Sequence, residues 1–152
     1  VRVETFNNGT QACLAYMNYE GNYVSYYLKV AEAGEYDITF NAANGRAGFD
    51  FDPGIEVNGT PHPATITAVQ TGDGDGASEW CNFEDLTPVT VTLPAGDVIL
   101  TLRAAVTNKY PNIDYILIEK KAENAQAAKT ATATRLPTRI SSCWWMSTTT
   151  RS

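Results

Sequence analysis

The sequence predicts an all-β protein, folded as a two-sheet antiparallel β-sandwich of the jelly-roll type. Three observations lead to this prediction. Short segments alternate apolar and polar residues with the period of two that is typical of strands. Gly, Pro, Asn and Asp separate these segments at intervals of about ten residues, as in sandwich proteins. Before residue 120 no segment carries the apolar stripe of an amphipathic helix.

The strands are expected to follow one another through residues 1–120. The first clear strand is 23–30, where aromatic and β-branched residues alternate. In the next, 35–42, the apolar side chains Tyr36, Ile38 and Phe40 share one face. The other expected strands are 55–57, which a tight Asn-Gly turn closes, then 65–69, 89–93, 98–102 and 113–118.

Charge divides the chain into two parts. Residues 1–120 carry 6 Lys and Arg against 16 Asp and Glu, a net charge of −10, and residues 121–152 carry 5 against 1, a net charge of +4. The second part is rich in Ala, Thr and Ser and has no sustained apolar period. We therefore expect one sandwich domain at 1–120 and a low-complexity basic tail or linker at 121–152.

Composition excludes several classes of function. The strongly acidic domain is a poor partner for nucleic acid, whose binding needs clustered Lys and Arg. A membrane-spanning helix would need about 18 consecutive apolar residues, and no such run occurs. One His and three Cys weigh against a zinc site. That histidine, His62, lies between two prolines and is expected in a loop.

No enzyme signature is recognisable. A nucleophile with its base, a metal cluster or a spaced pair of carboxylates would be needed, and none has a recognisable spacing. Aromatic residues in loops next to amides and acids suit a sugar-binding surface instead, because a ring covers the apolar face of a pyranose and the polar groups bind its hydroxyls. We expect a binding protein and no catalysis.

Four stretches in register resemble the family 6 carbohydrate-binding modules, with family 35 as a close relative. The resemblance covers residues 1 to about 120. The stretches are Val1-Arg-Val-Glu4-Thr5; Leu14-Ala-Tyr-Met17 with Glu20-Gly-Asn-Tyr-Val-Ser-Tyr26; Trp80-Cys-Asn-Phe83 with Val89-Thr-Val-Thr-Leu-Pro-Ala-Gly96; and Asn112-Ile-Asp-Tyr-Ile116.

The resemblance implies a sugar site in the loops at one end of the sandwich. Tyr16 and Trp80 match the two aromatic rings that clasp a sugar in the family. Asn112 matches an amide that binds sugar hydroxyls, and Glu4 matches an acidic residue with a similar role. Tyr110 is expected at the edge of the site.

A structural calcium ion is also implied, with Asp114 as the ligand from the final strand. Two alignments of the beginning stay open. In the favoured one, Glu4 belongs to the sugar site and the opening strand of the family, with its other calcium ligands, lies before Val1. In the other, residues 1–4 are the opening strand and Glu4 is a calcium ligand.

Cysteine pairing stays open as well. If Tyr16 and Trp80 face each other, Cys13 and Cys81 approach a distance at which a disulfide is feasible. The alternative is two buried free thiols.

The resemblance implies a non-catalytic module that targets a polysaccharide of the xylan or β-glucan class. We expect a monomer that is tethered to the catalytic domain of a secreted, extracellular glycoside hydrolase. The alternative is a structural or adhesive β-sandwich that binds a protein partner with the same aromatic residues.

Overall fold

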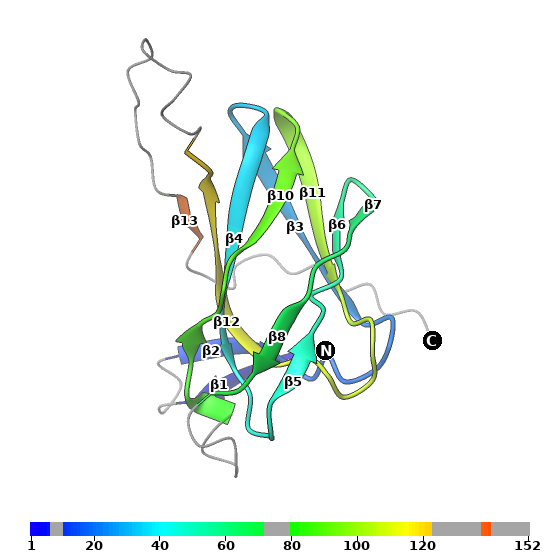
Figure 1. Ribbon diagram of the computed structural model, residues 1–152, viewed down its shortest axis with the longest axis vertical. Coiled ribbons are helices and arrows are strands. Elements are labelled where there is room, and N and C mark those ends of the chain that lie inside the picture. The colour runs from blue at the N-terminus through cyan, green and yellow to red at the C-terminus, as the bar shows by residue number, and fades with distance from the viewer. Residues whose placement is uncertain (7–10, 72–79, 123–137, 141–152) are drawn as a thin grey trace.

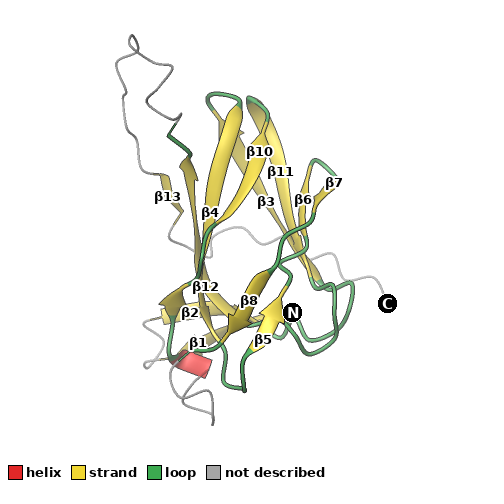
Figure 2. Ribbon diagram, in the orientation of Figure 1, coloured by secondary structure: helices red, strands yellow, loops and turns green. Residues whose placement is uncertain are grey.

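Antiparallel strands and one short 3-10 turn at Trp80 and Cys81 make up the secondary structure of the computed structural model, which describes residues 1–6, 11–71, 80–122 and 138–140 (Figures 1 and 2). None of the described segments forms a helix that is long and apolar enough to cross a membrane. The strands are β1 (Arg2–Phe6), β2 (Gln11–Ala15), β3 (Tyr23–Val30), β4 (Gly34–Ala43), β5 (Phe49–Phe51), β6 (Ile55–Val57), β7 (Thr60–His62), β8 (Ile66–Val69), β9 (Glu84–Asp85), β10 (Val89–Leu93), β11 (Gly96–Arg103), β12 (Asn112–Lys120) and β13 (Thr138–Ile140).

Two main sheets face each other and confirm the predicted sandwich. The larger has the order β1-β2-β12-β4-β10, with β9 on β4 and β13 on β12. The smaller has the order β3-β11-β6-β7, and β5 pairs with β8 in a separate ribbon. Because β3 and β4 are consecutive but lie in different sheets, as do β10 and β11, the chain crosses repeatedly between the layers, as in a jelly roll.

The apolar core lies between the sheets. The alternation of β4 places Ile38 and Phe40 inside, where both are fully buried. Aromatic rings connect the layers: Phe51 packs edge to face on Phe40, with 5.7 Å between the ring centroids, and on Tyr110, with 4.8 Å. Edge-to-face packing is the favoured geometry for such rings.

Tyr110 is a correction to the sequence analysis, which placed it at the edge of the sugar site. Its side chain is buried, and its hydroxyl donates a hydrogen bond to the carbonyl oxygen of Pro53 at 3.2 Å. Burial is the main reason why the pKa of the Tyr110 hydroxyl lies well above its ordinary value. Tyr110 is thus a core residue.

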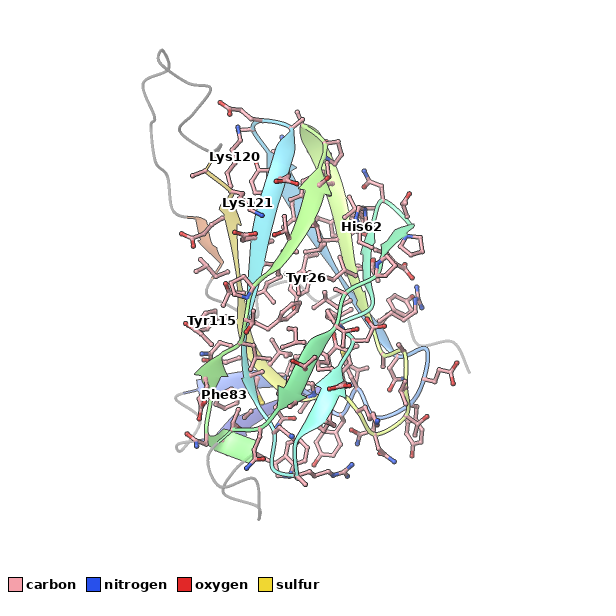
Figure 3. All side chains as sticks on the ribbon, in the orientation of Figure 1. Tyr26, His62, Phe83, Tyr115, Lys120 and Lys121 are labelled. Carbon is pink, nitrogen blue, oxygen red and sulfur yellow. The ribbon has the colours of Figure 1, made fainter. Side chains whose placement is uncertain are left out.

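His62 is a second correction, because it lies on β7 and is half-buried (Figure 3). β7 pairs only with β6 among the described strands and forms the edge of the smaller sheet. Edge strands tolerate proline, which cannot donate to a neighbouring strand. Pro61, which argued for a loop, therefore fits this edge strand.

β12 carries β13, the last of the described strands, on part of its edge. Ile113 pairs with Leu14 of β2, and further along β12 the residues Ile116 to Ile118 pair with β13. β13 lies within 121–152, whose expected role as a tail or linker stays a prediction.

Candidate functional site

One end of the sandwich gathers the residues that the sequence analysis selected. β2, β4 and β11 end there, and β12 begins there, so the connections 16–22, 44–48 and 104–111 lie near one another (Figure 1). The connections β3–β4 and β10–β11, which cross between the sheets, turn at the opposite end of the molecule. This topology explains how residues distant in sequence come together.

Trp80 lies on a glycine of the β4–β5 connection. A Cβ atom on Gly45 would stand only 2.2 Å from Cδ1 and 2.3 Å from Nε1 of the indole. Arg46 places its guanidinium carbon 5.7 Å from the centre of the same indole, within the range of a cation–π contact. The indole is therefore seated on bare backbone with a positive charge beside it.

Asn112 is brought to Trp80, as expected, but its contact is with the main chain. Its Nδ2 donates a hydrogen bond to the carbonyl oxygen of Trp80 at 3.1 Å. This bond ties the beginning of β12 to the turn that carries the indole. The side-chain amide has a second N–H and a carbonyl oxygen with which to bind a ligand.

Tyr16 lies near Asn112 and has an unusual backbone conformation. Leu14 pairs with Ile113, so Tyr16 and Asn112 occupy neighbouring positions at the ends of β2 and β12. Tyr16 has a φ of 60° and its side chain is 46% exposed. The left-handed conformation is unfavourable for a bulky residue, and such strain gathers at functional positions.

Hydrogen bonds of the buried Asn44 hold the backbone next to Gly45 and Arg46. Asn44 is fully buried, and its Nδ2 donates to the carbonyl oxygen of Val69 at 2.8 Å. The Asn44 N–H donates to Oγ1 of the buried Thr71 at 2.8 Å, and the Asn44 side-chain oxygen accepts from the Arg46 N–H at 3.1 Å. Buried polar groups that are fully paired fix a single conformation of the backbone around them.

Glu4 and Asp114 are not brought together by any described contact. Glu4 lies on β1 opposite Cys13, and its side chain lies outside what the structure describes. Asp114 sits in a β-bulge of β12, where the register with β4 shifts between Ile113 and Tyr115.

Calcium needs six to eight oxygen ligands. Among the side chains that the structure describes, no group of three or more His, Cys, Asp or Glu is placed to hold a metal ion. Calcium binding at Asp114 stays a prediction.

The two described cysteines do not form a disulfide. Cys13 is buried on β2, and Cys81 is exposed in the turn after Trp80. Cys13 and Cys81 are therefore not joined to each other, and the exposed position of Cys81 also differs from the expected alternative, in which both thiols were buried.

Sequence reasoning missed Gly45 and Arg46. Neither residue belongs to a motif that marks a sugar site. Their positions next to Trp80 depend on the packing of two connections that are more than 30 residues apart. The available signal is a single arginine next to a glycine in a strongly acidic domain, and this signal is weak.

Comparison with known proteins yields matches to solved structures alone. No family model matches the sequence, and no curated protein matches it. A family 35 carbohydrate-binding module from Clostridium thermocellum is 24% identical, with a TM-score of 0.63 over 79% of this chain and 88% of that module. The fold is that of a family 35 module.

Two further structures extend the comparison. A family 35 module solved in complex with a disaccharide that contains glucuronic acid is 23% identical, with a TM-score of 0.59 over 80% of this chain and 87% of that one. An exo-β-1,3-galactanase from Phanerochaete chrysosporium, with bound galactotriose, is 18% identical, with a TM-score of 0.58 over 77% of this chain and 25% of the enzyme.

These matches refine the family resemblance. They support the fold of a carbohydrate-binding module, and the modules among them belong to family 35, which the sequence analysis named as the close relative. They give no specific support to family 6.

Proposed function

We propose that this chain is a non-catalytic carbohydrate-binding module and that it binds a polysaccharide at the end of the sandwich that carries Trp80. One observation carries the proposal: Asn112, which neighbours the exposed and strained Tyr16, bonds the main chain of Trp80, whose indole is seated on Gly45. Two aromatic side chains connected through one amide, with polar groups around them, are the equipment that a shallow sugar site needs. The carbohydrate-binding fold of the structural neighbours supports the same function.

Binding would proceed without any change to the sugar. The apolar face of a pyranose covers an aromatic ring, and the burial of each ring contributes on the order of 1 to 2 kcal/mol. Asn112 offers its remaining amide groups to the hydroxyls, and Glu4 stays the predicted acidic partner. Because the site is shallow and open to water, we expect a Kd between roughly 1 mM and 1 μM.

We propose the xylan or β-glucan class as the ligand, with a preference for chains that carry a carboxylate. The guanidinium of Arg46 beside the Trp80 ring supports this preference, since Arg pairs well with a planar carboxylate. The structural neighbour solved with a glucuronic acid disaccharide agrees with it. The net charge of −10 on residues 1–120 opposes acidic ligands at long range, so the preference would rest on Arg46 itself.

The proposed setting is a secreted glycoside hydrolase to which this module is tethered as a monomer. The galactanase neighbour supports this setting, because the matched region is a quarter of that enzyme. The galactanase activity of that enzyme is not proposed for this chain.

The alternative, an adhesive domain that binds a protein, has one observation in its favour. Tyr27 of β3, 79% exposed, is the cross-strand partner of the exposed Ile99 on the outer face of the smaller sheet. An exposed aromatic next to an exposed aliphatic residue is typical of protein contact surfaces. Only two such residues meet there, which makes this alternative weaker.

Affinity electrophoresis on gels containing xylan, glucuronoxylan or β-glucan tests the proposal. Trp80→Ala should lose retardation, and the matched control Tyr27→Ala should keep it, with circular dichroism to check both folds. Arg46→Gln should lose the preference for glucuronoxylan and keep binding to neutral chains. Unchanged retardation of Trp80→Ala, or loss in Tyr27→Ala alone, would contradict the assignment.

A further inference from the structure

We propose a second sugar subsite at Tyr19, so that the module binds one glycan chain across Trp80, Tyr16 and Tyr19 together. The inference rests on the proposed function and adds to it the length of the ligand and a residue that the sequence analysis did not select.

Exposed apolar side chains gather on the connections beside the Trp80 site. Tyr19 is 70% exposed, and Val106 of the facing connection is 50% exposed. Together with Tyr16, they give this end of the sandwich three large apolar side chains in two neighbouring loops. A ring left in water on a loop has no packing role, but it can cover the face of a sugar.

The loop that carries Tyr19 is held by a closed set of hydrogen bonds. The Asn22 N–H donates to the carbonyl oxygen of Tyr19 at 3.0 Å, and the Tyr19 N–H donates to Oδ1 of Asn22 at 3.3 Å. The Gly21 N–H donates to the carbonyl oxygen of Ala104 at 2.9 Å, and the Ala104 N–H donates to that of Asn22 at 2.8 Å.

Two further hydrogen bonds tie residues 18–20 to the second loop. The Asn108 N–H donates to the carbonyl oxygen of Asn18 at 2.8 Å, and the Glu20 N–H donates to Oγ1 of Thr107 at 3.3 Å. The backbone under Tyr19 is thus ordered before a ligand arrives. A preorganised site loses less entropy on binding than a loop that must first be fixed.

Arg46 connects this loop pair to the Trp80 site. Its Nη1 donates to the carbonyl oxygen of Asn108 at 3.2 Å, while its guanidinium carbon lies 5.7 Å from the Trp80 ring centre. Asn108 in turn holds Asn18, the residue before Tyr19. A continuous series of contacts therefore runs from the indole to the Tyr19 turn.

The spacing suits neighbouring sugars of one chain. Tyr16 and Tyr19 are three residues apart, so their Cα atoms are separated by at most about 11 Å. Side chains carried on Cα atoms this close can contact successive parts of an oligosaccharide, whereas a monosaccharide is expected to occupy only one of them. The subsite should therefore make affinity increase with the length of the oligosaccharide.

Isothermal titration of xylo-oligosaccharides and cello-oligosaccharides, from the monosaccharide to the hexasaccharide, tests the inference. In the unmodified chain, affinity should rise by about tenfold between the monosaccharide and the longer members of the series that binds. Tyr19→Ala should lose this rise and leave monosaccharide affinity unchanged, and Tyr19→Phe should restore it. Tyr27→Ala, which removes an equally exposed ring from the sheet, should behave like the unmodified chain.

The outcomes separate the two proposals. If oligosaccharides bind and Trp80→Ala abolishes binding, but Tyr19→Ala keeps the full dependence on length, the Tyr19 subsite is wrong and the main site stands. If affinity does not rise with length in the unmodified chain, the subsite is also wrong. If no member of either series, and no glucuronic acid-bearing member added to them, binds at all, both proposals fail.

Discussion

The Trp80 indole and Gly45 are in such close contact that no side chain fits between them: a Cβ on Gly45 would lie 2.2 Å from Cδ1 of the ring. Gly45 is not in the left-handed region, so alanine is compatible with its backbone. The close approach of the ring alone therefore explains why the residue is glycine. A larger side chain at position 45 would push the Trp80 ring out of its place.

Gly45→Ala should displace the indole and weaken glycan binding by at least tenfold. The loss of unfolding free energy should be smaller than the loss of binding free energy. Trp80 fluorescence, measured in a Trp144→Phe, Trp145→Phe background, should shift to longer wavelength as the ring becomes more exposed. Gly48→Ala is the matched control, because a Cβ there would meet its neighbours at 3.4 Å or more. If the two variants bound glycan equally well, the close contact between Trp80 and Gly45 would not be required for binding.

Backbone strain at Tyr16 predicts an inverted order of stability. With φ at 60°, glycine should be more stable than alanine at this position by about 1 kcal/mol, although glycine is usually the worse of the two. Urea unfolding of Tyr16→Gly and Tyr16→Ala measures the difference, and both should bind glycan more weakly than the unmodified chain. A more stable alanine variant would mean that the strain is absent in solution.

Asn44 should matter for stability more than any exposed asparagine. Asn44→Leu removes its side-chain hydrogen bonds to Val69 and Arg46 and leaves the buried carbonyl oxygen of Val69 unpaired, which should cost about 2 to 4 kcal/mol of unfolding free energy. Asn82→Leu, at an exposed position near Trp80, should change stability by less than about 0.5 kcal/mol. Chemical denaturation of both variants gives the comparison, and a neutral Asn44→Leu would refute the supporting role.

The ion pair between Glu56 and Arg103 predicts how stability changes in acid. Arg103 Nε donates to Oε1 of Glu56 at 2.7 Å and Nη2 to Oε2 at 3.2 Å. The hydrogen bond to Arg103 is the main reason why the pKa of the Glu56 carboxyl is lowered. A lowered carboxyl pKa adds stability that is present above the ordinary carboxyl pKa and is lost as the pH falls through the lowered one.

Glu56→Gln should therefore be less stable than the unmodified chain at pH 7, by on the order of 0.5 to 1 kcal/mol for a partly exposed pair. The difference should disappear in acid, below the lowered pKa. Thermal unfolding across this pH range measures it. A difference that stays constant with pH would show that the carboxylate charge plays no part.

Much of the sandwich is visible in the sequence because one face of each long strand is buried. The alternation of apolar residues predicted β3 and β10 at their observed bounds, and β4, β11 and β12 to within two residues at each end. β5, β6, β7 and β9 have two or three residues each, too few for alternation alone to register, and among them only β6 was predicted, with the help of the Asn-Gly turn that closes it. Their existence depends on pairing with distant segments, which a local pattern does not contain.

Part of the candidate site is also visible in the sequence, and part of it is not. Trp80 and Asn112 belong to stretches that resemble a known family, and the structure brings both together. The contact of Asn112 with the Trp80 carbonyl, the seat on Gly45 and the position of Arg46 arise from tertiary packing and leave no local signal. Tyr110 shows the reverse error, because an aromatic next to a site motif in the sequence is here part of the core.

The direction of β12 has a consequence for how the module is attached. Its nine residues begin at Asn112, beside the proposed glycan site, and end at Lys120, so the chain leaves this strand about 30 Å from the proposed sugar-binding end. Lys120 and Lys121 lie at the far end of the sandwich in Figure 3. β13 then runs back along β12, from Thr138 opposite Ile118 to Ile140 opposite Ile116. A catalytic domain joined after β13 would therefore start from the flank of the sandwich, between the far pole and the surface that meets the polysaccharide.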